Sequence, residues 1–137
     1  LSKHGGALDK LVKPINSNIG APLGSGKQWQ SWIHINDLAS MFLFAVEEDL
    51  DGVYNAVAPN PVTNKKMTHL IADQLDKPLF LPSVPKFVLK MMLGEMSNVV
   101  LASQLVSPDK IREEGFSFDF SDLQTALEDI YPGKLVS

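Results

Sequence analysis

The chain has 137 residues, of which 45% are apolar and 20% are charged, and it contains no cysteine. This composition is typical of one folded domain, and it excludes a disordered tail, a disulfide framework and zinc–thiolate sites. The net charge is −4 and Arg112 is the only arginine, so we expect no nucleic-acid partner. The longest apolar run covers residues 41–46, far fewer than the roughly 20 residues that cross a membrane, so we expect no membrane partner.

The first elements expected along the chain are a loop, a strand and a helix. Residues 1–28 are rich in glycine and proline, with one short helix at 7–13 that Pro14 ends. Alternation predicts a strand over 29–35. One face of this strand carries Trp29, Ser31, Ile33 and Ile35, and the other carries Gln30, Trp32 and His34. Asn36 or Asp37 then caps a helix that runs to about residue 48. Apolar residues nearly encircle this helix, so we expect burial on more than one side.

The second half is predicted to be mostly helical. Further strands are expected over residues 53–58 and 79–81, and helices start near Thr63, Pro85, Ser107 and Ser121. Within the helix after Pro85, we assign the dry face to Phe87, Val88, Met91 and Met92, and assign Met96 to packing as well. A methionine-rich surface for a lipid or a partner is the alternative. The sum is an α/β fold with about three short strands and five or six helices, in which the strands suit the edge of a larger sheet.

Two motifs with chemical potential have simpler interpretations. Gly24-Ser25-Gly26 has the composition of a phosphate-binding loop, but a strand follows it instead of a helix, so a plain turn is preferred. His34 and Asp37 lack a third ligand at suitable spacing, so we predict no metal site and a helix-capping role for Asp37. Ser31 and His34 lie on opposite strand faces, which excludes a catalytic triad.

Indole and amide groups concentrate at residues 28–32, where both tryptophans of the chain lie. Such groups are typical of ligand pockets. The alternative is that one tryptophan belongs to the core while the other covers an interface. His34 follows directly, and either a ligand or a backbone group is its expected partner.

Three segments together resemble a known family: residues 24–29 (GSGKQW), 31–38 (SWIHINDL) and 55–62 (NAVAPNPV). They are similar to the extended short-chain dehydrogenase/reductases, in the branch of nucleoside-diphosphate-sugar epimerase-like proteins. Some members of this branch are named cell division inhibitors. Residues 93–96 (LGEM) and 114–116 (EGF) also resemble the C-terminal domain of unknown function of that branch.

The resemblance implies that the chain is the C-terminal fragment of a longer, Rossmann-like protein. Leu1-Ser2 would then end the sixth strand of a missing N-terminal Rossmann domain, which binds NADP or NAD. Residues 1–28 would connect to that domain, 29–62 would complete its sheet, and 63–137 would form a mostly helical substrate lobe. The fragment alone would bind no cofactor and would not be a catalyst.

Position in the family pattern also implies the site. The expected substrate-pocket residues are Gln28, Trp29, Gln30, Trp32 and His34, and Ser2 and His4 are expected near the cofactor. No Tyr-x-x-x-Lys motif is present, so no catalytic residue is assigned. Gln30 stands where relatives often carry an arginine that clamps a substrate diphosphate, which argues against a nucleotide-sugar substrate.

The resulting hypothesis is the substrate-binding lobe of an NAD(P)-dependent epimerase-like oxidoreductase in the cytoplasm. Its partners would be a small-molecule substrate of unknown identity and the missing Rossmann domain, and a homodimer is left open. The alternative is a protein-interaction or regulatory module without catalysis.

Overall fold

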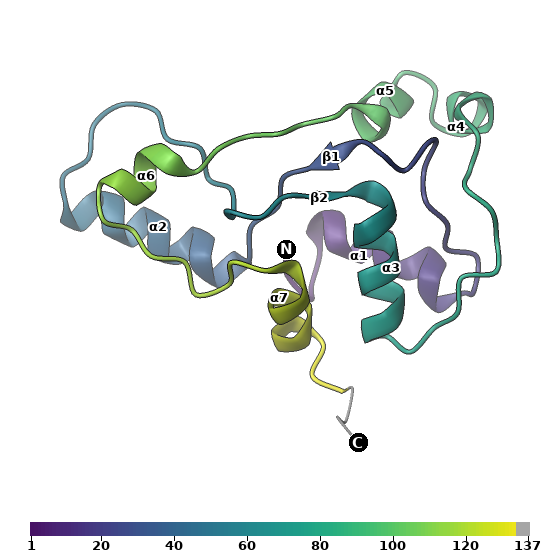
Figure 1. Ribbon diagram of the computed structural model, residues 1–137, viewed down its shortest axis with the longest axis horizontal. Helices are drawn as coiled ribbons and strands as arrows, with labels where there is room; N and C mark the ends of the chain where they lie inside the picture. Colours follow the sequence, from purple (N-terminus) through teal and green to yellow (C-terminus); the bar gives the residue numbers. More distant parts are fainter. Residues whose placement is uncertain (134–137) are drawn as a thin grey trace.

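The computed structural model describes residues 1–133, which form seven helices and one two-stranded sheet (Figure 1). The helices are α1 (Gly6–Asn16), α2 (Ile35–Glu47), α3 (Asn64–Gln74), α4 (Lys86–Leu93), α5 (Met96–Leu101), α6 (Asp109–Glu113) and α7 (Leu123–Ile130). In the sheet, β1 (Trp29–Gln30) pairs antiparallel with β2 (Val62–Thr63). The α/β class is confirmed. There is one helix more than expected, because Gly94 separates α4 from α5 with a φ of 58°, which favours glycine.

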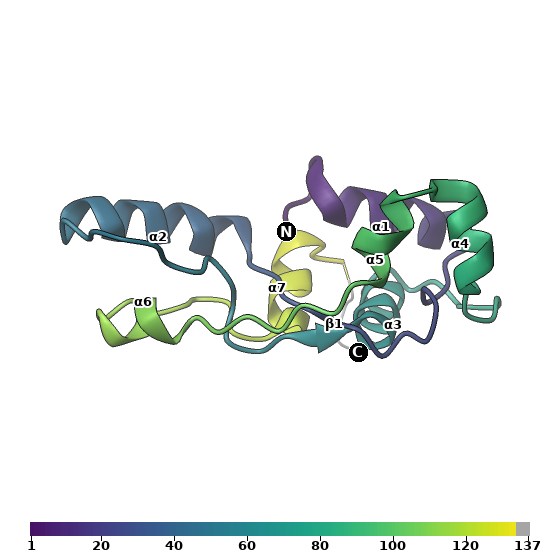
Figure 2. The same ribbon diagram turned by 90° about the horizontal axis from the view of Figure 1, so that it is seen from above.

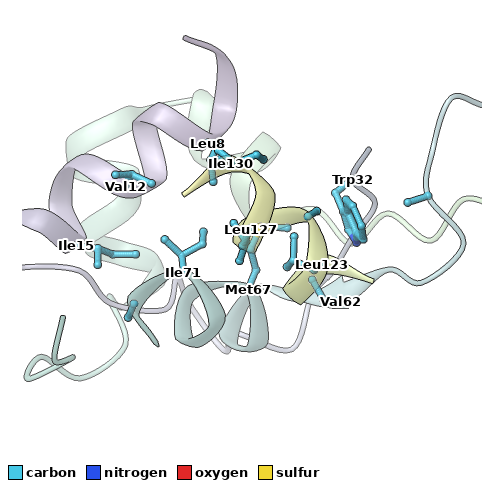
Figure 3. Packing of buried hydrophobic residues seen from close by; sticks show 13 residues of the cluster. Leu8, Val12, Ile15, Trp32, Val62, Met67, Ile71, Leu123, Leu127 and Ile130 are labelled. Atoms are coloured by element: carbon cyan, nitrogen blue, oxygen red, sulfur yellow. The ribbon is translucent and has the colours of Figure 1, made fainter. Parts of the chain in front are cut away.

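The main core lies where α1, α3 and α7 meet (Figure 3). Each helix buries apolar residues that recur at helical spacing. These are Leu8, Val12 and Ile15 from α1, Met67 and Ile71 from α3, and Leu123, Leu127 and Ile130 from α7. Trp32, which follows β1, lies at the edge of this cluster. The core therefore fixes the residues after β1 against three helices.

A second, smaller core joins α2 to α6, and these two helices extend side by side away from the main core (Figure 2). Met41 of α2 packs with Ile111 of α6 and with Phe116. The Phe116 ring meets Phe44 and Phe118 edge to face, with centroids 5.5 and 5.0 Å apart. None of the described helices has the length and apolar character that crossing a membrane requires.

The predicted strands are largely wrong. Only residues 29–30 of the expected strand 29–35 lie in the sheet, and residues 53–58 and 79–81 form no strand. Residues 53–57 make no backbone–backbone hydrogen bond within the described part of the chain. A strand needs a neighbour with which to form a ladder, and residues 1–133 provide none for these apolar segments.

The alternation of faces along residues 28–35 is confirmed. Gln28, Trp32 and His34 are buried, whereas Trp29 and Ile35 are exposed. This pattern arises because the backbone stays extended beyond the two residues of β1.

Two predictions of burial are wrong for this chain. On α2, Phe42, Leu43 and Val46 are exposed, Val46 to 78%. On α4 and α5, the assigned packing methionines Met91, Met92 and Met96 are all exposed, as is Phe87. The buried residue of α4 is Leu89 instead. Residues 1–133 therefore form two apolar helix faces without supplying the elements that would cover them.

Candidate functional site

The predicted pocket is built on β1, which is held against the segment that follows α5. The Trp29 N–H donates to Ser103 Oγ at 3.0 Å, and the Trp29 carbonyl accepts from the Gln104 N–H at 2.8 Å. Ser31 Oγ donates to the Gln104 carbonyl and accepts from the Val106 N–H, both at 3.2 Å. Sequence reasoning missed this pairing, because its partners lie more than 70 residues apart.

The buried side chain of Gln28 connects the Gly24–Gly26 turn to α5 by hydrogen bonds. Its Nε2 donates to the carbonyls of Leu23 at 3.0 Å and Val100 at 3.3 Å. Because an amide nitrogen has two protons, both donors of Gln28 are already used within the chain. Gln28 therefore positions the start of β1, and its assignment to the pocket stays a prediction.

The two tryptophans have different environments. Trp32 is 4% exposed, and its indole N–H donates to the Asn60 carbonyl at 2.8 Å. Trp29 is 42% exposed. Of the two indoles, only that of Trp29 is accessible for contact with a ligand or a partner.

His34 joins the start of α2 to the C-terminal end of α7. Its Nδ1 accepts from the Asn36 N–H at 3.0 Å, and its Nε2 lies 3.1 Å from the Asp129 carboxylate. Since Nδ1 is an acceptor, the network assigns the ring proton to Nε2, which donates to Asp129. The ring also stacks on Phe120, with centroids 3.9 Å apart. Both nitrogens have protein partners, so the backbone contact predicted as one of two options is present.

The prediction that Asp37 caps α2 is wrong, because the capping side chain is His34. Asp37 is 1% exposed, and its two carboxylate oxygens accept from the backbone N–H groups of Asp119 and Phe120, each at 2.9 Å. The residue therefore ties α2 to the segment before α7. Helix-capping preference is a local signal and could not reveal acceptors for amides more than 80 residues away.

Gln30 carries an acceptor without a donor. Its Oε1 is buried and has no hydrogen-bond partner among the described residues. Buried polar atoms are nearly always paired, so such an atom points to a donor supplied from elsewhere. Among the predicted pocket residues, Trp29 and Gln30 therefore keep groups that find no partner within residues 1–133.

The remaining assigned residues have simple surroundings. Ser2 Oγ donates to the His4 carbonyl at 3.2 Å, and the His4 side chain is exposed. Their proximity to a cofactor stays a prediction. Within residues 1–133, no three His, Asp or Glu side chains are grouped as metal ligands.

The Gly24–Gly26 loop is a turn whose two glycine amides are used internally. The Gly24 N–H donates to the Val84 carbonyl at 2.7 Å, and the Gly26 N–H donates to the Leu23 carbonyl at 3.0 Å. The Lys27 N–H donates to Ser25 Oγ at 3.1 Å. A phosphate cradle needs free N–H groups, so the turn interpretation agrees with the structure.

Comparison with known proteins places this architecture among epimerase-like proteins. Residues 84–130 match the family described as a domain of unknown function, DUF1731. An epimerase family protein of Staphylococcus aureus is 44% identical over 131 residues, which cover 95% of this chain and 43% of that protein. An epimerase family protein of Staphylococcus epidermidis is 40% identical over 131 residues, which cover 95% of this chain and 44% of that protein.

Two solved structures have the same fold. The human epimerase family protein SDR39U1, solved with NADPH, matches with a TM-score of 0.89 and 32% identity, over 97% of this chain and 45% of that one. The nucleoside-diphosphate sugar epimerase of Corynebacterium glutamicum matches with a TM-score of 0.71 and 30% identity, over 96% and 24%. The expected resemblance to the epimerase-like branch is confirmed, and the chain spans less than half the length of these relatives.

Proposed function

We propose that this chain is the substrate-binding lobe of an NAD(P)-dependent epimerase-like oxidoreductase. A Rossmann domain outside these 137 residues would bind most of the cofactor. The human relative was solved with NADPH, and this chain matches 45% of that protein. The observation that carries the proposal is an unfinished interface on α2 and residues 53–57.

That interface combines apolar side chains with unpaired backbone. Phe42, Leu43 and Val46 of α2 are exposed, together with Val53. Burying each of them would contribute roughly 1.5–3 kcal/mol. Residues 53–57 also make no backbone–backbone hydrogen bond to the described chain, in which the Val53 carbonyl accepts only from Lys110 Nζ at 2.7 Å. An additional strand could supply the missing backbone ladder.

The start of the chain already follows the pattern of a parallel sheet. The Leu1 N–H group donates to the Ile33 carbonyl, and the Leu1 carbonyl accepts from the Ile35 N–H at 2.9 Å. In parallel pairing, the N–H and the carbonyl of one residue form hydrogen bonds with two residues of the neighbouring strand that lie two positions apart. Leu1 has this relation to Ile33 and Ile35. A sheet that continues from Leu1 would lie beside α2 and would support the same docking.

The described residues do not themselves fit a dinucleotide. Such a site uses the free amides of a glycine turn that leads into a helix, whereas both glycine amides of the Gly24–Gly26 turn are occupied and β1 follows it. When bound by the rest of the protein, the cofactor would accept or donate hydride. The role of this lobe is therefore to bind and orient the substrate and to exclude water from it.

Within the lobe, we assign substrate contact to Trp29 and Gln30. The accessible Trp29 indole offers a flat apolar surface. The half-buried Gln30 carries an amide oxygen, Oε1, that no described group satisfies and that would turn outward to meet a substrate donor. Neither group carries charge. This chemistry fits a neutral substrate with a hydroxyl or N–H donor better than a diphosphate, which arginine binds most effectively.

The first experiment measures cofactor binding. The protein as its gene encodes it and the 137-residue chain are each titrated with NADPH and NADH by calorimetry. We expect the encoded protein to bind one of them and the chain alone to bind neither. An encoded protein that binds neither nucleotide would refute the proposal.

The second experiment separates substrate from cofactor. The encoded protein, loaded with the nucleotide it binds, is screened by thermal shift against nucleoside-diphosphate sugars and small neutral carbonyl compounds. For a compound that binds, Trp29→Ala should weaken its affinity about tenfold and change nucleotide affinity less than twofold. Phe80→Ala, at another exposed aromatic residue, is the matched control and should change neither affinity. Equal losses of both affinities in Trp29→Ala would contradict the assignment.

A further inference from the structure

Five exposed lysines gather around the glycine turn, between the starts of α3 and α4. We name this set the lysine patch, and it consists of Lys27, Lys65, Lys66, Lys86 and Lys90. The Lys65 N–H donates to the Gly26 carbonyl at 2.9 Å. A Cβ at Gly24 would lie 3.6 Å from Lys86 Cγ. Lys27 follows the turn, Lys66 is next to Lys65, and Lys90 lies one helical turn beyond Lys86.

The lysine patch has no acidic neighbours in its own segments. All five lysines come from three segments, residues 11–36, 52–72 and 77–94. None of these segments contains Asp or Glu. The ion pairs found within residues 1–133 involve Lys13, Arg112 and His34, so none includes a patch lysine. A local charge of +5 thus lies on a chain of net charge −4. Such uncompensated charge attracts a negative partner.

An apolar row lies beside the lysines on α4. Phe87 and Met91 directly follow Lys86 and Lys90 in the sequence, and both are exposed, Met91 to 82%. Residues four apart share a face of a helix, so α4 presents a row of ammonium groups next to an apolar row. Methionine side chains adapt to differently shaped partners. The surface therefore matches a partner that is acidic along one side and apolar along the next.

We propose that the lysine patch and the α4 apolar row form a docking site for an acidic amphipathic helix of a partner protein. A single phosphate is disfavoured because the N–H groups of Gly24, Gly26 and Lys27 already have acceptors within the chain. An extended anionic surface, such as a membrane or a nucleic acid, is disfavoured by the overall charge, because 16 acidic and only 7 basic residues lie outside the patch. A single amphipathic helix needs to contact only the lysine patch and the apolar row, because its own apolar and acidic residues recur at helical spacing. This inference does not depend on the proposed function.

The test uses the protein as its gene encodes it and measures fluorescence anisotropy at low ionic strength. The probe is a labelled peptide of about 18 residues, five helical turns, with Glu along one face and Leu along the other. The paired peptide carries Lys in place of Glu. Anionic vesicles of phosphatidylcholine and phosphatidylserine, duplex DNA and inorganic phosphate are tested as competitors.

We expect the Glu peptide to bind and the Lys peptide not to bind. Lys86→Glu/Lys90→Glu should weaken binding at least about tenfold, and Phe87→Ser about fivefold. The control Lys3→Glu/Lys10→Glu changes the net charge equally at exposed lysines outside the patch, and it should have less than a twofold effect. Absence of binding, or binding that the two double variants weaken equally, would overturn the proposal. Displacement of the peptide by vesicles, DNA or phosphate at equal charge concentration would also overturn it, in favour of that ligand.

Discussion

Asp37→Ala tests whether the long-range carboxylate contact holds α2 in place. The carboxylate is buried, and it accepts two backbone hydrogen bonds of 2.9 Å from Asp119 and Phe120. Removing it leaves both N–H groups without their acceptors, at a cost of about 1–3 kcal/mol for each that stays buried. Because these groups are only partly buried, we expect a total loss of about 2–4 kcal/mol. Asp37→Asn keeps one acceptor oxygen and should lose about half as much.

Urea unfolding, followed by circular dichroism, measures this loss. Asp119→Ala is the matched control, because Asp119 contributes only its backbone N–H to the contact and its side chain is exposed. This control should stay within about 0.5 kcal/mol of the wild type. The reasoning is refuted if Asp37→Ala costs no more than the control, or if Asp37→Asn costs more than Asp37→Ala.

Three further predictions concern packing and ionisation. By urea unfolding, Trp32→Ala should lower the free energy of unfolding by about 3–5 kcal/mol. The exposed Trp29→Ala should lower it by less than about 1 kcal/mol. Equal losses would contradict the difference in burial between the two indoles. Gly20→Ala should cost about 1–3 kcal/mol in the same assay, because the added Cβ would lie 2.5 Å from an isoleucine Cγ1, and an unchanged midpoint would disprove the clash. Desolvation, then the charge of Glu114, raises the pKa of Tyr54 above its ordinary value of 10.0. Ultraviolet titration of the phenolate should show Glu114→Gln lowering that pKa. The pKa of Tyr54 is higher in the folded than in the unfolded protein. Its contribution to folding stability is therefore complete below the unfolded-state pKa and is lost as the pH rises through the folded-state pKa.

The helices that build the main core could be predicted because their signals are local. Leu123, Leu127 and Ile130 repeat at helical spacing, and α7 buries all three. The sequence predicts a helix start near Thr63, with Thr63 or Asn64 as the cap, and the Thr63 side chain accepts from the Lys66 N–H at 3.3 Å. Caps and helical periodicity depend on neighbours within a few residues, so they do not require the rest of the protein.

The strands and the long-range ties could not be predicted in the same way. Residues 53–58 have the composition of a strand, but a ladder depends on a partner that the described chain does not supply. Asp37 has the local preference of a cap, and yet amides more than 80 residues away take its carboxylate. At the site, the sequence indicated the concentration of indole and amide groups. Only the contacts show that Trp32 and Gln28 face the protein interior while Trp29 stays accessible.

The two uncovered apolar faces differ in charge, and this difference separates their proposed occupants. The α2 face lies within residues 28–64, which contain no Lys or Arg but include four acidic residues at positions 47–51. The basic group found in contact with this segment is Lys110 of α6, whose ammonium already contacts the Val53 carbonyl and the Tyr54 ring. The α4 face carries Lys86 and Lys90. Docking of a Rossmann domain on α2 would depend mainly on apolar burial, whereas docking of an acidic helix on α4 would depend largely on charge.

Ionic strength should therefore act on only one of the two contacts. Exposed charges are screened over about 3 Å at 1 M salt, compared with about 10 Å at 0.1 M. Raising salt across this range should release the acidic peptide from the encoded protein. The same change should leave hydrogen-exchange protection at Phe42 and Val46 intact, because salt does not weaken apolar burial. Loss of protection on α2 together with release of the peptide would mean that the two faces belong to one salt-dependent interface, and the separate assignments would then be wrong.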